Sequence, residues 1–146
     1  MKITQLSVFL ENKPGRLSVP CKTLAAAGLN ILTLSLADTR QFGILRLVIQ
    51  DWKKAKQVLE AAGLVVNVTE VIAIEVDDRP GGLAHVLEVI ESADMNLEYM
   101  YAFTFGGEDK AALVFRFEDP DSAIKLLTSK GVNVVDSVDL FDRAKR

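Results

Sequence analysis

The chain is poor in the residues that build disulfides and metal sites. Its 146 residues include one cysteine, Cys21, and one histidine, His85. A single cysteine cannot form an internal disulfide, and one residue of each kind leaves too few soft ligands for a zinc site. We therefore expect no bound metal and no other cofactor.

Long hydrophobic runs are also missing. No stretch approaches the roughly 18 uncharged apolar residues that a membrane-spanning helix requires. The amino-terminal segment meets Glu11, Lys13 and Arg16 before a signal-like stretch develops. These absences indicate a soluble protein without an export signal, so we expect a cytoplasmic location and no membrane partner.

The excess of charge is small. Lysine and arginine number 17 against 20 acidic residues, which gives a net charge of -3 at pH 7. Sequence-independent affinity for nucleic acid depends on basic side chains that neutralise phosphates. Nucleic acid is therefore not an expected partner, and the composition, 49% hydrophobic and 25% charged, is that of an ordinary globular protein.

What the chain does contain is an internal repeat. The sequence ENKPGRLS of residues 11–18 aligns with DDRPGGLA of residues 77–84, at an offset of 66 positions. Further on the offset becomes 68, where Leu59 matches Leu127 and Gly63 matches Gly131. A unit of about 70 residues thus occurs twice. We expect two domains, residues 1–68 and 69–146.

Hydrophobic periodicity changes in the same order in both copies. An alternating run is followed by helical spacing, then by two runs separated by a turn, a second helix and a last strand. The predicted strands are residues 2–10, 30–37, 42–50 and 65–68, and residues 72–76, 96–105, 110–117 and 132–140. We expect residues 143–146 to form a frayed tail.

This order predicts the fold. Strand, helix, strand, strand, helix, strand with right-handed crossovers builds a four-stranded antiparallel sheet with both helices on one face. The fold class is therefore α+β, with two ferredoxin-like βαββαβ units in tandem. Asp51 and Asp119 are suitable N-caps of the second helices, Gly63 and Gly131 close these helices, and Pro20 predicts a late or kinked start of the first.

The Pro-Gly segment recurs with its chemistry largely intact, where a strand ends and a helix begins. A helix start offers backbone N–H groups and a positive dipole end, which suit a carboxylate or a phosphate. Gly15 and Gly81 allow a ligand to approach the backbone, and Asn12 and Asp78 supply oxygens beside it. An isolated Pro-Gly usually only turns the chain, but its recurrence favours the binding of a zwitterion.

The sequences PGRLSVPCKTLAAAGLNI of residues 14–31 and PGGLAHVLEVIESADMNL of residues 80–97 resemble the ACT domain. Each is preceded by an alternating strand and followed by a hairpin, a helix and a strand, so the resemblance covers nearly the whole chain as two copies. It implies a non-catalytic regulatory or sensor protein that binds a free amino acid at the junction between paired units. Because no catalytic domain is fused, a separate enzyme or regulator is the expected target.

The resemblance also implies two sites, each joining the turn of one copy to the second-strand start of the other. The first comprises Asn12, Pro14, Gly15, Arg16 and Leu17 with Asn96 and Leu97, and the second Asp78, Pro80, Gly81, Gly82 and Leu83 with Asn30 and Ile31. Arg16 aligns with Gly82, so the sites are not equivalent. We expect Arg16 to close over a carboxylate and Asp78 to favour an ammonium. The plain alternative for Asn30 and Asn96 is a permissive backbone position after a helix.

An aromatic row follows the first helix of the second copy. Its alternate residues are Leu97, Tyr99, Tyr101, Phe103 and Phe105. In the first copy we expect Leu32, Leu34 and Leu36 to face the helices. When the two copies are aligned, the aromatic row then falls on the opposite face of the sheet. Either a bulge shifts the register or another sheet covers the row. We favour the second and expect a homodimer.

Other functions stay open. An acylphosphatase-like hydrolase would need an arginine and a water-orienting asparagine, for which Arg16 and Asn30 are the available pair. Tyr99, Tyr101 and Phe103 suggest stacking on RNA, which the 16 acidic against 8 basic residues of that half oppose. A pure protein-assembly module is the third alternative. His85 has no serine, cysteine or second acid at a suggestive spacing, so we expect a solvated side chain and no enzyme activity.

Overall fold

The computed structural model describes residues 1–38, 40–106 and 109–144. They divide into two compact units. The N-terminal unit is Thr4–Thr69, and the C-terminal unit consists of Met1–Ile3 and the chain from Glu70 onward. None of the helices in the described segments combines the length and the hydrophobicity of a membrane span.

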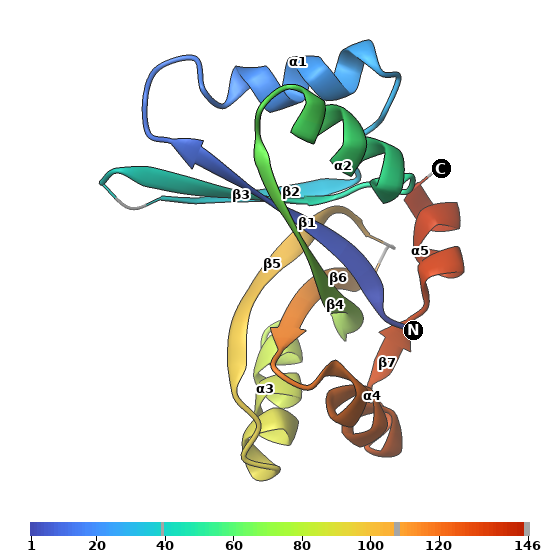
Figure 1. Cartoon of the computed structure of the whole chain (residues 1–146). Helices are drawn as coiled ribbons and strands as arrows, with labels where there is room; N and C mark the ends of the chain where they lie inside the picture. Colours follow the sequence, from blue (N-terminus) through green and yellow to red (C-terminus); the bar gives the residue numbers. More distant parts are fainter. Residues whose placement is uncertain (39, 107–108, 145–146) are drawn as a thin grey trace. The chain divides into compact units, whose positions relative to one another are not determined.

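The N-terminal unit contains a four-stranded sheet and two helices (Figure 1). Its elements are β1 (Ile3–Glu11), α1 (Ser18–Ala26), β2 (Thr33–Asp38), β3 (Phe42–Val48), α2 (Trp52–Ala61) and the first part of β4 (Val65–Asp77). The strand order is β2-β3-β1-β4, and the β1–β3 and β2–β3 pairs are antiparallel. Leu24 of α1 and Leu59 of α2 join the buried core of the strands, so both helices cover one face.

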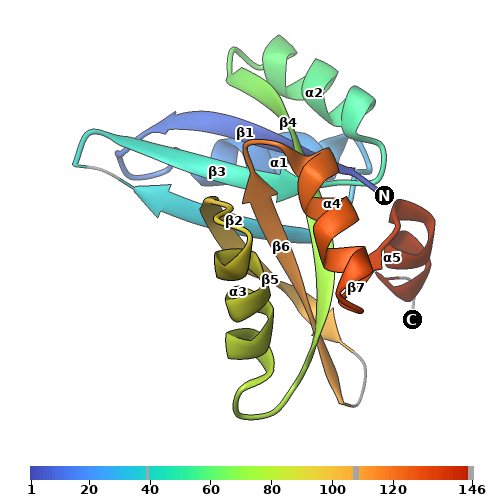
Figure 2. The same ribbon diagram turned by 90° about the horizontal axis from the view of Figure 1, so that it is seen from below.

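The C-terminal unit repeats this arrangement. The second part of β4 is followed by α3 (Gly82–Ser92), β5 (Leu97–Gly106), β6 (Lys110–Phe117), α4 (Pro120–Ser129), β7 (Asn133–Val135) and α5 (Ser137–Ala144). β4 pairs with β6 and β7, and β6 pairs with β5, all antiparallel. Figure 2 shows α3 and α4 on the same side of β4 and β6. Ile90 of α3 and Leu127 of α4 both join the core of this unit.

β4 is one strand of 13 residues that belongs to both units. Its first part is the last strand of the first copy, and its second part is the first strand of the second. The order βαββαβ therefore occurs twice, which confirms the predicted α+β class of two ferredoxin-like units. The domain bounds 1–68 and 69–146 stay a prediction.

The helix boundaries follow from capping residues. Asp51 accepts a hydrogen bond from the N–H of Lys54, and Asp119 accepts one from the N–H of Ser122, as predicted. Gly63 and Gly131 have positive φ just after α2 and α4. α1 begins at Ser18, two positions later than α3, which begins at the equivalent of residue 16. Pro20 thus accompanies the late start that it predicted.

The predicted last strand of residues 132–140 is confirmed for Asn133–Val135 and wrong beyond it. β7 ends at Val135, and α5 follows from Ser137 to Ala144. The side chain of Asp136 accepts a hydrogen bond from the N–H of Asp139, and this cap starts a helix where the alternation of valine and leucine suggested a strand. Leu140 is fully buried. The predicted frayed tail is also wrong at Arg143 and Ala144, which end this helix; residues 145–146 lie outside the described residues.

The aromatic row is interrupted by a bulge in β5. Leu97 pairs with Phe117, but Tyr99 pairs with Arg116 and Met100 with Phe115. The extra residue places both Leu97 and Met100 against the core and leaves Tyr99 and Tyr101 on the opposite face. Phe103 is 7% exposed, and the stacked rings of Tyr99 and Tyr101 are half-buried. The row is thus partly buried within one chain, and the side chain of Phe105 lies outside the described residues.

In the first copy the predicted side of β2 is confirmed for two leucines. Leu34 pairs with Leu47 and Leu36 with Leu45, and those partners belong to the core beneath the helices. Because directly paired residues point to the same face, Leu34 and Leu36 lie on the helix side. Both remain about half exposed at this outer strand.

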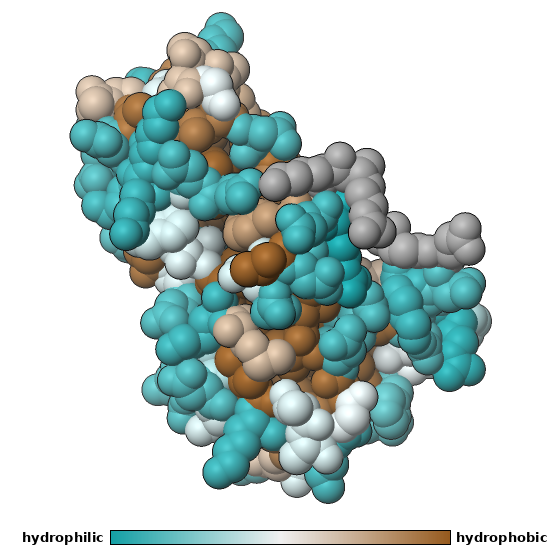
Figure 3. Space-filling model, turned by 90° about the vertical axis from the view of Figure 1, so that its right-hand side faces the viewer, coloured by the Kyte–Doolittle hydropathy of each residue, from teal (hydrophilic) through white to brown (hydrophobic). Residues whose placement is uncertain are grey.

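Exposed hydrophobic side chains occur elsewhere among the described residues. Figure 3 shows hydrophobic residues between hydrophilic ones on one face of the molecule. Over the described chain the exposed large ones are Met1, Phe9, Leu17, Val19, Leu34, Leu36, Phe42, Val65, Val68 and Val138. Scattered residues of this kind are normal, so only those that gather in a hollow need an explanation.

Candidate functional site

A pocket of about 280 Å³ lies beside the Pro-Gly turn of the N-terminal unit. The turn joins β1 to α1, and the pocket is also walled by the segment that joins α2 to β4. Its lining residues are Phe9, Leu10, Glu11, Arg16, Val19, Ala62, Gly63, Leu64 and Val65. Three segments of the chain thus converge on one hollow.

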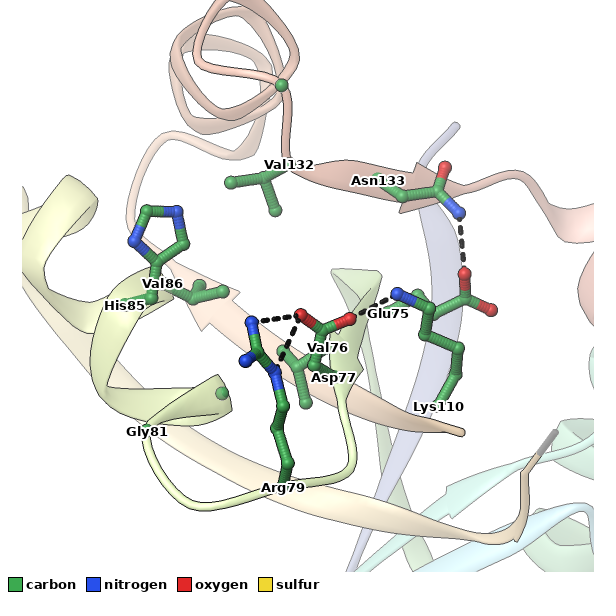
Figure 4. A pocket seen from close by; sticks show the side chains of 12 residues that line it. Glu75, Val76, Asp77, Arg79, Gly81, His85, Val86, Lys110, Val132 and Asn133 are labelled. Atoms are coloured by element: carbon green, nitrogen blue, oxygen red, sulfur yellow. Dashed lines mark hydrogen bonds and ion pairs between the residues drawn. The ribbon is translucent and has the colours of Figure 1, made fainter. Parts of the chain in front are cut away.

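A second pocket, of about 290 Å³, lies beside the Pro-Gly turn of the C-terminal unit. Its lining residues are Glu75, Val76, Asp77, Arg79, Gly81, Gly82, His85, Val86, Lys110, Gly131, Val132 and Asn133. Figure 4 shows His85 at one end of this pocket, Glu75 and Asn133 at the other, and Asp77 between Arg79 and Lys110.

The two pockets occupy the same place in the two copies. Residues 9–11 align with 75–77, residues 16 and 19 with 82 and 85, and residues 63–65 with 131–133. The duplicated fold therefore forms a hollow at the same turn twice. The sequence singled out the turn but missed the wall after the second helix, because that wall is about fifty residues away along the chain and carries no motif of its own.

The turns themselves have matching backbone geometry. Gly15 has φ of 83° and Gly81 has φ of 89°, a left-handed conformation that glycine adopts without strain. The N–H of Arg16 donates to the carbonyl of Lys13, and the N–H of Gly82 donates to that of Arg79. The turn therefore needs glycine at this position for its shape, whatever it binds.

Gly82 has no room for a side chain, whereas the equivalent position in the first copy does. A Cβ atom at this position would lie 1.9 Å from the carbonyl oxygen of Asp77, far inside contact distance. In the first copy the same position holds Arg16, whose side chain is about half exposed and lines the pocket. The C-terminal pocket can therefore carry no side chain where the N-terminal pocket carries a guanidinium group.

In the N-terminal pocket one carboxylate faces two cations. Nζ of Lys13 lies 3.1 Å from Oε2 of Glu11, and Nη2 of Arg16 lies 3.8 Å from the same oxygen. The hydrogen bond from Lys13, with the charges of Lys13 and Arg16, lowers the pKa of Glu11 below its usual value. Glu11 is thus ionised at neutral pH, and the cluster keeps one positive charge in excess.

In the C-terminal pocket Asp77 also has two cationic partners. It forms an ion pair with Lys110 and another with Arg79, whose Nη2 lies 3.1 Å from Oδ2. Hydrogen bonds from Lys110 and Arg79 lower the pKa of Asp77, and the positive charge of Lys110 lowers it as well. Lys110 is paired with Asp77 across β4 and β6, where the first copy has Phe42 opposite Glu11.

Glu75 links the C-terminal pocket to α5. Nδ2 of Asn133 donates to Oε1 of Glu75 at 3.1 Å, and Arg143 of α5 pairs with Oε2. Nη2 of Arg143 also lies 2.8 Å from Asp139, one turn earlier in the helix. Burial raises the pKa of Glu75. The hydrogen bonds from Arg143 and Asn133 together lower this pKa by more than burial raises it, so the net pKa lies below the usual value.

Three of the predicted site residues line these pockets. Arg16 lines the N-terminal pocket, and Gly81 and Gly82 line the C-terminal one. Asn12 contacts the neighbouring hairpin instead, because its N–H donates to the carbonyl of Gln41 and its side chain to that of Arg40. The N–H of Asp78 donates to the carbonyl of Asp109 in the same way.

The other predicted residues lie in the turns, the helix starts or the segments after the first helices. Leu83 and Leu97 pack against the core of the C-terminal unit, and Ile31 packs against that of the N-terminal unit. Leu17 is 40% exposed. Asn30 and Asn96 follow Gly28 and Asp94, which hold the positive φ at the ends of α1 and α3. The remaining predicted residues are Pro14, Gly15 and Pro80. A site that joins residues of both copies stays a prediction.

The pockets offer no evident metal site. Among residues 1–38, 40–106 and 109–144 no cluster of three or more histidine, cysteine or acidic side chains is placed to hold a metal ion. Cys21 is a half-buried free thiol on α1. His85 is exposed, as expected, and it also lines the C-terminal pocket, because it lies one helical turn after Gly81.

Comparison with known families assigns the repeated fold. Residues 1–144 match the family model of the ACT domain pair. The chain belongs to this family. ACT domain pairs are typically non-catalytic regulatory domains, and membership supports a regulatory, ligand-binding role.

Solved structures extend this result. Protein BT0572 from Bacteroides thetaiotaomicron is 37% identical, with 97% of this ACT domain pair and 96% of that chain covered and a TM-score of 0.89. The ligand-free regulatory subunit of aspartate kinase from Thermus thermophilus is 13% identical over 86% and 91% of the chains, with a TM-score of 0.62. The regulatory subunit of aspartate kinase from Thermus flavus is 15% identical, with 86% of this chain and 90% of that chain covered and a TM-score of 0.61. These two share the fold. No curated protein matches the chain significantly.

Proposed function

We propose that this ACT domain pair is a non-catalytic sensor that binds a free amino acid beside its Pro-Gly turns, at the junction between the paired units. The observation that carries the proposal is the recurrence of one pocket at the same turn in both copies. Each pocket borders the Pro-Gly turn, which is the segment whose chemistry the sequence repeats. Family membership supports the regulatory role.

The chemistry of the turns suits a zwitterion. Arg16 offers a planar guanidinium group that binds a carboxylate through two parallel hydrogen bonds. Asp78, in the second turn, offers a carboxylate for an ammonium group. The pocket volumes lie near the lower end of the roughly 300–1,000 Å³ that is usual for small-molecule sites, so the ligand is of amino-acid size.

The partners follow from this role. A regulated enzyme or regulator is the proposed partner, and an effect on it requires a coupling of about 1–3 kcal/mol between the ligand-bound and free states. A homodimer is supported by β2, an outer strand of the N-terminal sheet that exposes Leu34 and Leu36. Light scattering at micromolar concentration tests the dimer, and a monomeric mass would reject it. The protein acts in the cytoplasm.

The direct test is a thermal-shift screen of the full chain against the twenty amino acids. A ligand at one hundred times its Kd stabilises the folded state by about 2.7 kcal/mol, which is a readily measured shift. The proposal expects one or a few related amino acids to raise the melting temperature. No response to any of them would reject the proposal and favour an assembly module, whereas hydrolysis of acyl phosphates would favour the hydrolase.

The junction is tested separately. Asn96→Ala and Asp78→Ala replace one residue in each predicted site, and calorimetric titration with the amino acid found in the screen measures their effect. At least one variant should bind more weakly. Unchanged affinity in both would remove these residues from the site.

A further inference from the structure

The walls of the two pockets differ in polarity at three equivalent positions. The N-terminal pocket has Phe9, Val19 and Val65, which are 39%, 38% and 62% exposed. The equivalents in the C-terminal pocket are Glu75, His85 and Asn133. All three positions change from apolar to polar, although backbone, turn and volume stay nearly the same. The two hollows therefore favour different occupants.

The exposed hydrophobic residues of the N-terminal pocket indicate an occupant with an apolar body. Three of the large hydrophobic side chains that the described chain exposes line this one hollow. Covering such a surface removes apolar area from water, which is favourable without any specific contact. A wholly polar ligand would leave this gain unused.

Arg16 supplies the polar end of the same pocket. Its Nη2 is 3.8 Å from Glu11, longer than a hydrogen bond, whereas Lys13 lies within hydrogen-bond distance of that carboxylate. Arg16 therefore has donors to offer a carboxylate on a ligand. The other copy cannot reproduce this contact, because the carbonyl oxygen of Asp77 leaves no space for a side chain at Gly82.

We propose that the pocket of the N-terminal unit binds a small carboxylate with an apolar side chain, an aliphatic or aromatic amino acid. Arg16 holds the carboxylate, and Phe9, Val19 and Val65 cover the side chain. The pocket of the C-terminal unit does not take this ligand. The inference rests on the proposed function and adds the chemical class of the ligand and the copy that binds it.

The ligand class is tested by calorimetric titration of the full chain with three probes. L-leucine has both the carboxylate and the apolar side chain, leucinamide lacks the carboxylate, and L-aspartate lacks the apolar side chain. We expect leucine to bind and the other two to bind at least about tenfold more weakly, the usual loss for a missing charged hydrogen bond or a mismatched pocket. Equal binding of leucine and leucinamide, or a preference for aspartate, would overturn the inference.

The location is tested by exchanging residues between the copies. Val65→Asn introduces the residue of the C-terminal pocket, and Arg16→Ala removes the guanidinium group. Both side chains are more than half exposed, so the fold should tolerate these changes. Each should weaken leucine binding at least about tenfold. The matched variant Asn133→Val, in the other pocket, should leave leucine affinity unchanged.

The outcomes separate this inference from the proposed function. If no amino acid binds the wild-type chain, both fail. If leucine binds and Arg16→Ala and Val65→Asn bind it as well as wild type, while Asn96→Ala weakens binding, the proposed function stands and the inference fails. Weaker binding in Asn133→Val alone would place the ligand in the C-terminal pocket, which also overturns the inference.

Discussion

The two units share their core and differ in their pockets. At core positions the repeat preserves hydrophobicity, as in the pairs Leu6 and Ile72 or Leu59 and Leu127, all fully buried. At the pocket wall Val65 is replaced by Asn133, without any change in the surrounding fold. Core residues are constrained by packing, whereas the exposed wall is free to change. We therefore expect ligand specificity to reside in the residues that the fold does not need.

The units also differ in what holds the pocket. In the C-terminal unit Glu75 is fixed by Asn133 and by Arg143 of α5, whereas its equivalent in the N-terminal unit is Phe9, which has no charge to pair. A substitution in α5 therefore acts directly on the lining of the C-terminal pocket. The N-terminal pocket depends on its turn and its apolar wall.

The largest effect is expected from the shared core. Leu59→Ala and Leu127→Ala remove equivalent buried side chains, and each should lower the free energy of unfolding by about 3 kcal/mol because of lost burial and the cavity left behind. Urea denaturation of both variants measures the loss. A cost below about 1 kcal/mol in one of them would break the equivalence of the two cores.

The next effect separates the two turns. Gly82→Ala forces the backbone of Asp77 to move and should cost about 2 kcal/mol, whereas Arg16→Ala at the equivalent position should cost less than about 0.5 kcal/mol. The same denaturation experiment gives both values. Equal costs would contradict the steric difference between the turns.

A smaller effect is expected at α5. Arg143→Ala removes the charged partner of the part-buried Glu75 and should cost about 1 kcal/mol, since both side chains keep some contact with solvent. Arg79→Ala is the matched control, because this exposed arginine pairs with Asp77 on the surface and should leave the stability unchanged. Loss of helical circular dichroism in Arg143→Ala alone would show that α5 depends on this pair.

The smallest effect concerns pH. The folded-state pKa of Glu75 lies below its usual value of 4.5, so its ion pair stabilises the fold above that pH, and this contribution is lost as the pH falls through the folded-state pKa. Wild type and Arg143→Ala should therefore differ most in stability near neutral pH and converge in acid as Glu75 becomes protonated. A difference that stays constant from pH 7 to 3 would show that Glu75 does not carry it.

The fold could be predicted from the sequence because the duplication provides two versions of every element. The alternating residues of β1, the caps Asp51 and Asp119 and the closing glycines all act within a few residues of the chain. α5 was missed because the residues around Val134 alternate as in a strand and only the cap at Asp136 reverses that choice. The bulge at Glu98 shifts the pairing of β5 with β6 by one residue, and no residue type in the sequence there marks it.

The site could be predicted only where it is local. The Pro-Gly turns were found by their repetition, and Arg16 and Gly82 by alignment. Val65 and Asn133 were missed as wall residues because tertiary folding brings them to the turn, and Glu75 because its partner Arg143 is 68 residues away. Periodicity reports which face of a strand is buried, but it does not report which distant segment borders a hollow.

The most direct test is a crystal structure of the chain grown with L-leucine. The account predicts the carboxylate of leucine within hydrogen-bond distance of Arg16 and its side chain against Phe9 and Val65, with no leucine beside Asn133. Leucine bound in the pocket of the C-terminal unit, or bound away from both Pro-Gly turns, would contradict it.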